Sequence, residues 1–303
     1  MRVEVINLDK HFKKVHAVDS LGFTIEPGRV TGFLGPNGSG KSTTMRLMLG
    51  LDSGSGTTLF DGKPLRDHDS VTRVVGAHLD AKFFHPKRTA YSHLRMLGAE
   101  AGVSKERVYE VLELVGLDSV AKKRPGGFSL GMGQRLGLAG AMLADPQVLM
   151  LDEPANGLDP QSIQWMRDFL KHYASLGRSV LVSSHLLSEM QLLADDLVVI
   201  AKGKLIAAEP MNEFLARATG GAVRVRTTDA RKLAEALQAQ GLTLVATGED
   251  EMRVPNVTTD RVGHIAFASG VPILELSSET ASLESVFLQL TEGQEQYKIG
   301  GAE

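Results

Sequence analysis

Short apolar runs alternate with helical patterns over roughly the first 210 residues of the chain. The clearest runs are 30–34, 148–151, 179–182 and 197–200, and none of them holds a charged residue. Continuous apolar strands of this length are typical of a parallel sheet that helices cover on both faces. The pattern therefore predicts an α/β fold for this part of the chain, with a largely parallel and buried sheet.

Between residues 86 and 124 the strand-like runs stop and the pattern becomes mostly helical. The apolar residues of this segment are spaced as on one face of a helix. They are Leu94, Leu97, Val108, Leu112 and Val115. We predict a helical insertion in the α/β domain, covering about residues 86–135.

The pattern changes again near residue 220. A helical segment at 211–218 is followed by Gly220-Gly221, a pair that breaks helices and marks the best candidate domain boundary. The order of elements beyond it is that of the ferredoxin-like split unit, an α+β fold. Strand, helix, strand, strand, helix and strand are predicted at 222–226, 230–239, 242–246, 251–254, 259–268 and 271–276.

The chain is thus predicted to form two domains. The first covers 1–219, and a small accessory domain covers 220–291. A last helix would carry Leu283, Phe287 and Leu290 on one face, before a flexible tail at 292–303. One hypothesis makes the accessory domain a regulatory or dimerisation module for the first.

Composition excludes several classes of function. The 303 residues carry a formal net charge of −3, whereas binding to nucleic acid needs clustered excess Lys and Arg, so no nucleic-acid partner is expected. The absence of cysteine rules out disulfides and thiolate metal sites. Charges among the first ten residues disfavour a signal peptide, and the apolar stretch 136–144 is shorter than the roughly 18–20 residues that cross a bilayer. We expect a cytoplasmic chain that does not span a membrane by itself.

A phosphate-binding loop follows the apolar run 30–34. Its glycines would let backbone N–H groups close around phosphate oxygens, and the following helix, near 43–49, would add the positive end of its dipole. Lys41 would hold the β- and γ-phosphates, and the Ser42 hydroxyl would bind Mg²⁺. The loop fits G-x-x-x-x-G-K-[ST] and, with the first residue of the helix, comprises Gly35, Pro36, Asn37, Gly38, Ser39, Gly40, Lys41, Ser42 and Thr43.

Two acids end another buried run. Asp152 and Glu153 directly follow 148–151, which places their carboxylates at the carboxyl edge of the sheet, where α/β proteins bind ligands. Asp152 suits the Mg²⁺ shell, and Glu153 suits the general base that deprotonates an attacking water. The alternative is an acidic strand-to-loop junction at the surface, which the nearby phosphate loop disfavours.

With these motifs in this order, the sequence resembles the ATP-binding subunits of ABC transporters over about residues 2 to 215. Residues 128–135 read FSLGMGQR where that family has its signature, and Ser129 and Gly131 match it. The resemblance implies that this segment reaches across a head-to-tail dimer to the ATP of the other subunit. It further implies that Asp159, in a D-loop at 155–159, couples the two sites.

The resemblance also assigns roles to single side chains. His185, after the run 179–182, matches the switch histidine, which hydrogen-bonds the γ-phosphate. Phe12 lies where the family stacks an aromatic ring on adenine, although a lone Phe is as readily a core residue. For His78, His85 and His93, solvated loop positions are the favoured interpretation.

Two positions depart from the family pattern. Asp80 stands where most members carry a glutamine that touches Mg²⁺ and links the site to the membrane partner, and aspartate has no amide N–H to donate. Met132 replaces a residue of the signature, and the resulting SLGM sequence resembles the drug- and antibiotic-export branch. The resemblance implies an ATPase that powers export of a drug, antibiotic or lipid-like compound through a separate polytopic permease, peripheral on the inner face of the membrane. The alternative is a soluble ABC-type ATPase acting on ribosomes or DNA.

Overall fold

The computed structural model describes residues 1–80, 84–85, 87–218, 222–279, 283–284 and 286–287. These residues form two compact units, the first spanning Met1–Pro210 and the second Met211–Leu290. Several predicted features lie outside the described residues. They are the start of the helical insertion at residue 86, the Gly220-Gly221 breaker pair, Leu290 and the tail at 292–303.

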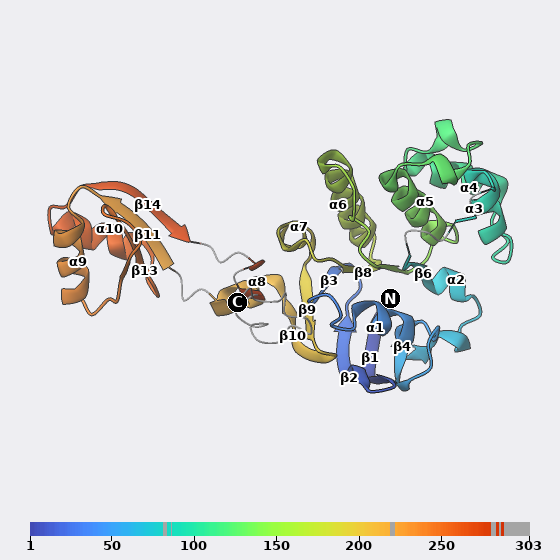
Figure 1. Cartoon of the computed structure of the whole chain (residues 1–303), viewed down its shortest axis with the longest axis horizontal. Helices are drawn as coiled ribbons and strands as arrows, with labels where there is room; N and C mark the ends of the chain where they lie inside the picture. The colour runs from blue at the N-terminus through green and yellow to red at the C-terminus, as the bar shows by residue number, and fades with distance from the viewer. Residues whose placement is uncertain (81–83, 86, 219–221, 280–282, 285, 288–303) are drawn as a thin grey trace, which may run out of the picture. The chain divides into compact units, whose positions relative to one another are not determined.

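A six-stranded sheet forms the centre of the first unit, as the apolar runs predict (Figure 1). Its order is β10-β9-β3-β8-β7-β6, and neighbouring strands are parallel except for β10 against β9. Every residue of β3, β7 and β8 is buried, which explains why these runs hold no charge. The strands are β3 (Val30–Leu34), β6 (Val75–His78), β7 (Val148–Leu151), β8 (Ser179–Ser183), β9 (Asp196–Ala201) and β10 (Lys204–Pro210).

A second, antiparallel sheet lies in the same unit, and the sequence prediction of a single parallel sheet was incomplete here. Its order is β2-β1-β4-β5. Phe23 of this sheet, Phe33 of β3 and Met45 of α1 belong to one buried cluster, so both sheets share a core with the helix. The elements are β1 (Val3–Phe12), β2 (Val15–Ile25), α1 (Lys41–Met48), β4 (Ser55–Phe60) and β5 (Lys63–Pro64).

Helices fill the predicted insertion and form one group within the first unit (Figure 1). Its last helix, α5, runs past residue 135 to Met142 and packs on β6. His93 of α3 and His78 of β6 are buried, so the interpretation of both as solvated loop residues was wrong, whereas His85 is exposed. The helices of this unit after α1 are α2 (Val71–Val74), α3 (Ala90–Leu97), α4 (Lys105–Leu114), α5 (Leu130–Met142), α6 (Pro160–Ser175) and α7 (Leu187–Leu193). Three short 3₁₀ turns cover Leu65–Asp67, Asp118–Val120 and Pro125–Gly127.

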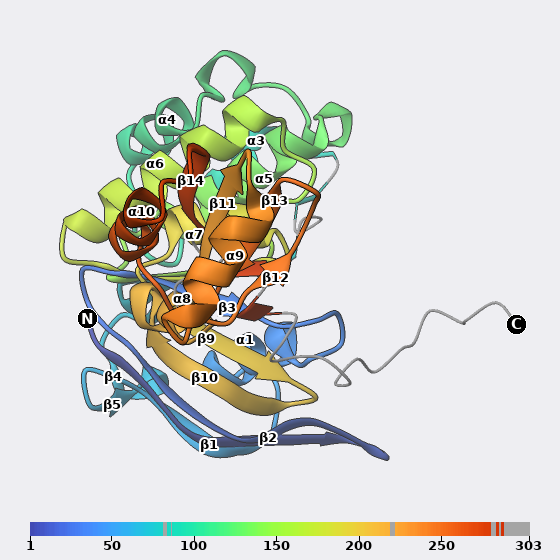
Figure 2. The same ribbon diagram turned by 90° about the vertical axis from the view of Figure 1, so that its left-hand side faces the viewer.

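The second unit has the predicted strand, helix, strand, strand, helix, strand order (Figure 2). Its antiparallel sheet has the order β12-β13-β11-β14, and apolar side chains such as Val225, Leu237 and Val262 form its core. The predicted strand at 242–246 is shorter than expected, since only Val245 and Ala246 pair. The elements are α8 (Met211–Ala218), β11 (Ala222–Thr227), α9 (Ala230–Ala239), β12 (Val245–Ala246), β13 (Glu251–Val254), α10 (Thr259–Ala268) and β14 (Ile273–Glu279).

Candidate functional site

The glycine-rich loop connects β3 to α1 at the carboxyl edge of the parallel sheet. Gly40 precedes α1 with φ 106°, a conformation that side chains rarely adopt, and a Cβ there would lie 2.3 Å from the Ala17 carbonyl oxygen. A Cβ on Gly35 would lie 2.5 Å from the Ile200 carbonyl oxygen. Glycine is therefore required at both positions for the loop to close over the end of the helix.

Lys41 begins α1, and its ammonium group turns back under the loop. Nζ donates hydrogen bonds to the carbonyl oxygens of Gly35 at 2.6 Å and Pro36 at 3.4 Å, and it lies 4.0 Å from Glu153 Oε1. The side chain is only 8% exposed. Burial lowers the pKa of Lys41, while the carboxylates of Glu153 and Asp152 act in the opposite direction. A buried cation with few anionic partners is a suitable ligand for phosphate.

Asp152 directly follows β7, and a serine from the neighbouring strand fixes it. Ser183, the last residue of β8, donates its hydroxyl hydrogen to Asp152 Oδ1 and accepts a hydrogen bond from Glu153 N at 2.8 Å. The sequence interpretation gave Ser183 no role of its own. A polar residue at the carboxyl end of a buried strand, beside two acids, was the signal that could have identified it.

The next acid, Glu153, has an unusual backbone conformation and a histidine partner. Its φ of 50° lies in the left-handed region, which costs a non-glycine residue about 1–3 kcal/mol. Its Oε2 accepts hydrogen bonds from His185, at 2.7 Å from Nδ1 and 3.3 Å from the backbone N. The Glu153 carboxylate is therefore held in place by an exposed imidazole.

A hollow of about 250 Å³ joins the loop to the two acids. Most of the residues predicted to hold phosphate and metal line it, and Gly35 and Pro36 flank it through their bonds to Lys41. The lining residues are Ala17, Asn37, Gly38, Ser39, Gly40, Lys41, Ser42, Thr43, Asp152 and Glu153.

The predicted dimer residues occupy other positions in the first unit. Ser129 and Asp159 cap α5 and α6, their side chains accepting hydrogen bonds from Met132 N at 3.2 Å and Ser162 N at 2.8 Å. Hydrogen bonds from the Ser162 backbone and hydroxyl keep the pKa of Asp159 below its ordinary value. None of these side chains, nor Gly131, lines the hollow.

Phe12 and Asp80 also lie outside the lining of the hollow. Phe12 ends β1 with 47% of its surface exposed, and Lys10 Nζ lies 4.8 Å from the centre of its ring. It is therefore not a core residue. Asp80 is exposed and lies two residues beyond β6, the strand that pairs with β7.

Comparison with known proteins shows the family to which this chain is similar. Residues 18–156 match the family described as "ABC transporter", and residues 221–284 match a domain of unknown function (DUF8746). The uncharacterised ABC transporter ATP-binding protein YhcH of Bacillus subtilis is 36% identical over 95% of both chains. The lantibiotic transport ATP-binding protein SrtF of Streptococcus pyogenes is 37% identical over 67% of this chain and 89% of its own. The Nod factor export ATP-binding protein I of Cupriavidus metallidurans is 32% identical over 95% of this chain and 97% of its own.

Solved structures show the same fold. An ATP-binding subunit of an ABC transporter matches with a TM-score of 0.65 and 24% identity, over 72% of this chain and 93% of that one. A dimeric bacterial ABC transporter cassette matches with a TM-score of 0.61 and 22% identity, over 69% and 98%. Among the described residues, no helix has the length and apolar character needed to cross a membrane. The chain belongs to the ATP-binding proteins of the ABC transporter family, and it is an ATPase.

Proposed function

We propose that this chain is the motor subunit of an exporter, bound to the inner face of the membrane through a separate polytopic permease. The carrying observation is the Glu153 carboxylate, which lies 4.0 Å from Lys41 at the hollow and is hydrogen-bonded to His185. The relatives named for lantibiotic transport and Nod factor export support a drug, antibiotic or lipid-like cargo. They do not favour the alternative of a soluble ATPase acting on ribosomes or DNA.

ATP binding is assigned to the loop and Lys41. The backbone N–H groups at the start of α1 and the buried ammonium face the hollow, where they would hold the phosphates. Ser42 and Asp152 both line it and supply a hydroxyl and a carboxylate, the oxygen donors that suit Mg²⁺. Bound Mg²⁺ would neutralise charge on the β- and γ-phosphate oxygens.

Proton transfer is assigned to Glu153. Its carboxylate would accept the proton of the attacking water, and the hydrogen bond from His185 keeps it oriented for that step. The imidazole of His185 would hydrogen-bond the γ-phosphate in place of Glu153, and it would lose this bond when the γ-phosphate leaves. Ser183 positions both acids from the neighbouring strand.

A second copy of the chain is proposed to complete each site. Ser129, Gly131 and Asp159 do not line the hollow of their own chain, which fits a role in the partner's site, and one fold neighbour is a dimeric cassette. Phe12, exposed at the end of β1, would stack on adenine. Asp80 would give Mg²⁺ a further oxygen and contact the permease.

Mixing two inactive variants tests the shared sites. Lys41→Ala damages the phosphate loop and Ser129→Arg damages the signature, so each variant alone should lose turnover. Half of the randomly formed dimers would hold one intact site, which should restore up to about a quarter of wild-type turnover. A mixture that stays as inactive as its components would contradict head-to-tail sites.

The export role is tested by what the full chain binds in its own membranes. Gentle detergent extraction and affinity purification should recover a polytopic protein together with ATPase activity that the exported compound stimulates. Recovery of ribosomes or DNA, with no membrane protein, would favour the alternative function. Removal of residues 220–291, our proposed regulatory or dimerisation module, should alter this stimulation or the oligomeric state seen in sedimentation.

A further inference from the structure

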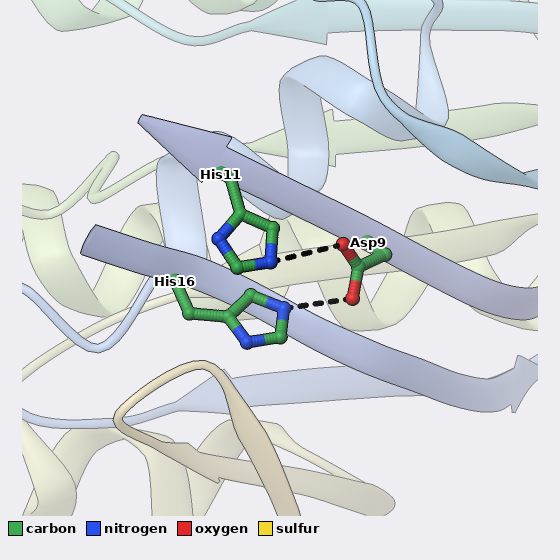
Figure 3. Close-up of side chains that lie close together, drawn as sticks. All are labelled: Asp9, His11 and His16. Atoms are coloured by element: carbon green, nitrogen blue, oxygen red, sulfur yellow. Dashed lines mark hydrogen bonds and ion pairs between the residues drawn. The ribbon is translucent and has the colours of Figure 1, made fainter. Parts of the chain in front are cut away.

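Two histidines and an aspartate meet on the β1–β2 pair, outside the hollow described above. His11 of β1 lies directly opposite His16 of β2 in the strand register. Asp9 precedes His11 by two residues on β1, and its carboxylate lies beside both rings. Figure 3 shows the two rings stacked on each other, with a nitrogen of each ring facing the Asp9 carboxylate.

The distances are those of a compact cluster. His16 Nε2 lies 2.7 Å from Asp9 Oδ2, His11 Nε2 lies 3.8 Å from Asp9 Oδ1, and the ring centres are 3.8 Å apart. One potential ligand atom from each side chain lies within 4.8 Å of the other two. Ligands about 2.0–2.2 Å from a tetrahedral ion lie roughly 3.4 Å apart, so small side-chain rotations would suffice.

A second carboxylate approaches the opposite side of His16. Asp19 Oδ2 lies 3.6 Å from His16 Nδ1, and Asp19 is held by Lys204 Nζ at 3.3 Å and by its backbone N–H to the Gly203 carbonyl at 2.8 Å. Metal-binding histidines commonly have a carboxylate on the nitrogen that does not bind metal, because it fixes the tautomer and the ring orientation. Asp19 is therefore placed to leave His16 Nε2 as the ligand atom.

We infer that Asp9, His11 and His16 bind one divalent cation of borderline softness, such as Zn²⁺, outside the hollow proposed for the phosphates and Mg²⁺. Two imidazoles and one carboxylate suit Zn²⁺, whereas Mg²⁺ prefers oxygen ligands. The chain holds no cysteine, so no thiolate competes for such an ion. His11 is exposed, which leaves room for water as a fourth ligand.

Equilibrium dialysis of the tag-free full chain with Zn²⁺ tests this inference, in excess Mg²⁺ and without nucleotide. The wild type should bind one Zn²⁺, and His11→Ala or His16→Ala should weaken binding at least tenfold. Asp19→Asn should weaken it about 10–100-fold, the usual effect of losing a carboxylate behind a histidine ligand. His185→Ala is the matched control, because it removes a second close histidine–carboxylate pair and should leave Zn²⁺ affinity unchanged.

Thermal unfolding provides a second readout that does not depend on ATPase activity. Zn²⁺ should raise the melting temperature of the wild type but not that of the His11→Ala/His16→Ala double variant, because only a ligand that binds the folded state stabilises it. Equal Zn²⁺ affinity in the wild type and the double variant would overturn the inference. So would loss of binding only in His185→Ala, which would place the ion at the ATP site.

Discussion

The two units of this chain treat their charged residues differently. In the first unit, Lys41 is buried under its loop and the Glu153 backbone is in a left-handed conformation at the edge of a parallel sheet. In the second unit, charges on neighbouring strands are paired, as in Arg224–Glu251 at 2.7 Å and Arg226–Asp250 at 3.3 Å. The buried Lys41 and the left-handed Glu153 backbone lower the stability of the first unit, whereas the ion pairs between strands of the second unit compensate their charges.

Single polar side chains show a further difference between the hollow and the second unit. Ser39 Oγ in the phosphate loop is buried and has no hydrogen-bond partner among the described residues. In the second unit, Asp229 and Thr258 cap α9 and α10 by accepting hydrogen bonds from backbone N–H groups. The buried Ser39 hydroxyl and the left-handed Glu153 backbone both lie at the hollow of the first unit.

The largest expected effect is on turnover. Lys41→Ala removes the buried ammonium that faces the phosphates, and it should lower ATP turnover by at least about 100-fold, the typical effect of losing one such electrostatic contact. Lys171→Ala, at an exposed position of α6, is the control and should retain activity. Steady-state phosphate release measures both, and a Lys41→Ala chain with normal turnover would remove Lys41 from the site.

The second unit should respond in stability rather than in turnover. Leu237→Ala deletes a fully buried side chain of its core and should cost that unit about 2–5 kcal/mol of unfolding free energy. Calorimetry should show the lost stability in one transition, while basal ATPase at low temperature stays within about twofold, a change below 0.5 kcal/mol. Leu274→Ala, at a half-exposed position, is the matched control. A parallel loss of basal ATPase would show that the units do not divide stability and chemistry in this way.

A smaller loss of turnover is expected when Ser183, which bonds to both acids, is changed. Ser183→Ala removes hydrogen bonds to Asp152 and Glu153 N, and a lost bond to a charged group costs about 1.5–3 kcal/mol. We expect kcat to fall about 10–100-fold with little change in ATP affinity. Ser175→Ala on the surface of α6 is the control. If kcat is unchanged while ATP affinity falls, Ser183 does not position the general base.

The smallest effect concerns the pH dependence of stability. His78 is 3% exposed, and burial lowers its pKa despite its 2.7 Å hydrogen bond to Gln134. Below a pH of about 6.5, His78 gains a proton in the unfolded chain but not in the folded chain. The free energy of unfolding should therefore decrease as the pH is lowered, by up to about 1.4 kcal/mol per pH unit. In His78→Gln, the free energy of unfolding measured with urea should depend less steeply on pH below this value. Equal slopes would mean that other groups cause the loss.

The parallel sheet and the motifs were predictable from the sequence because buried strands and glycine loops have short, local signals. The run 30–34 coincides with β3, and the loop, Asp152 and Glu153 meet at one hollow. The separation of Ser129 from that hollow was implied only by the family resemblance.

Other features depend on tertiary context. The antiparallel sheet escaped prediction because bulges interrupt the alternation of β1, with register shifts between Val5 and Leu8 and between Leu8 and Lys10. His78 looks like a loop residue in the sequence, but Gly137 of α5 leaves space for its ring, which lies 2.2 Å from the position of a Cβ there. Such a partner, 59 positions away in the chain, has no local signal.

Glu153 is proposed to activate water at the loop that Lys41 and Ser42 form. Glu153→Gln keeps the shape of the side chain but removes its basicity, so nucleotide affinity should persist while hydrolysis falls about 10²–10⁴-fold. Single-turnover hydrolysis of ATP, compared with the exposed control Glu113→Gln, measures this directly. ATP should remain bound and intact in Glu153→Gln, and dimers should accumulate in sedimentation. Hydrolysis at the wild-type rate in that variant would contradict this proposal.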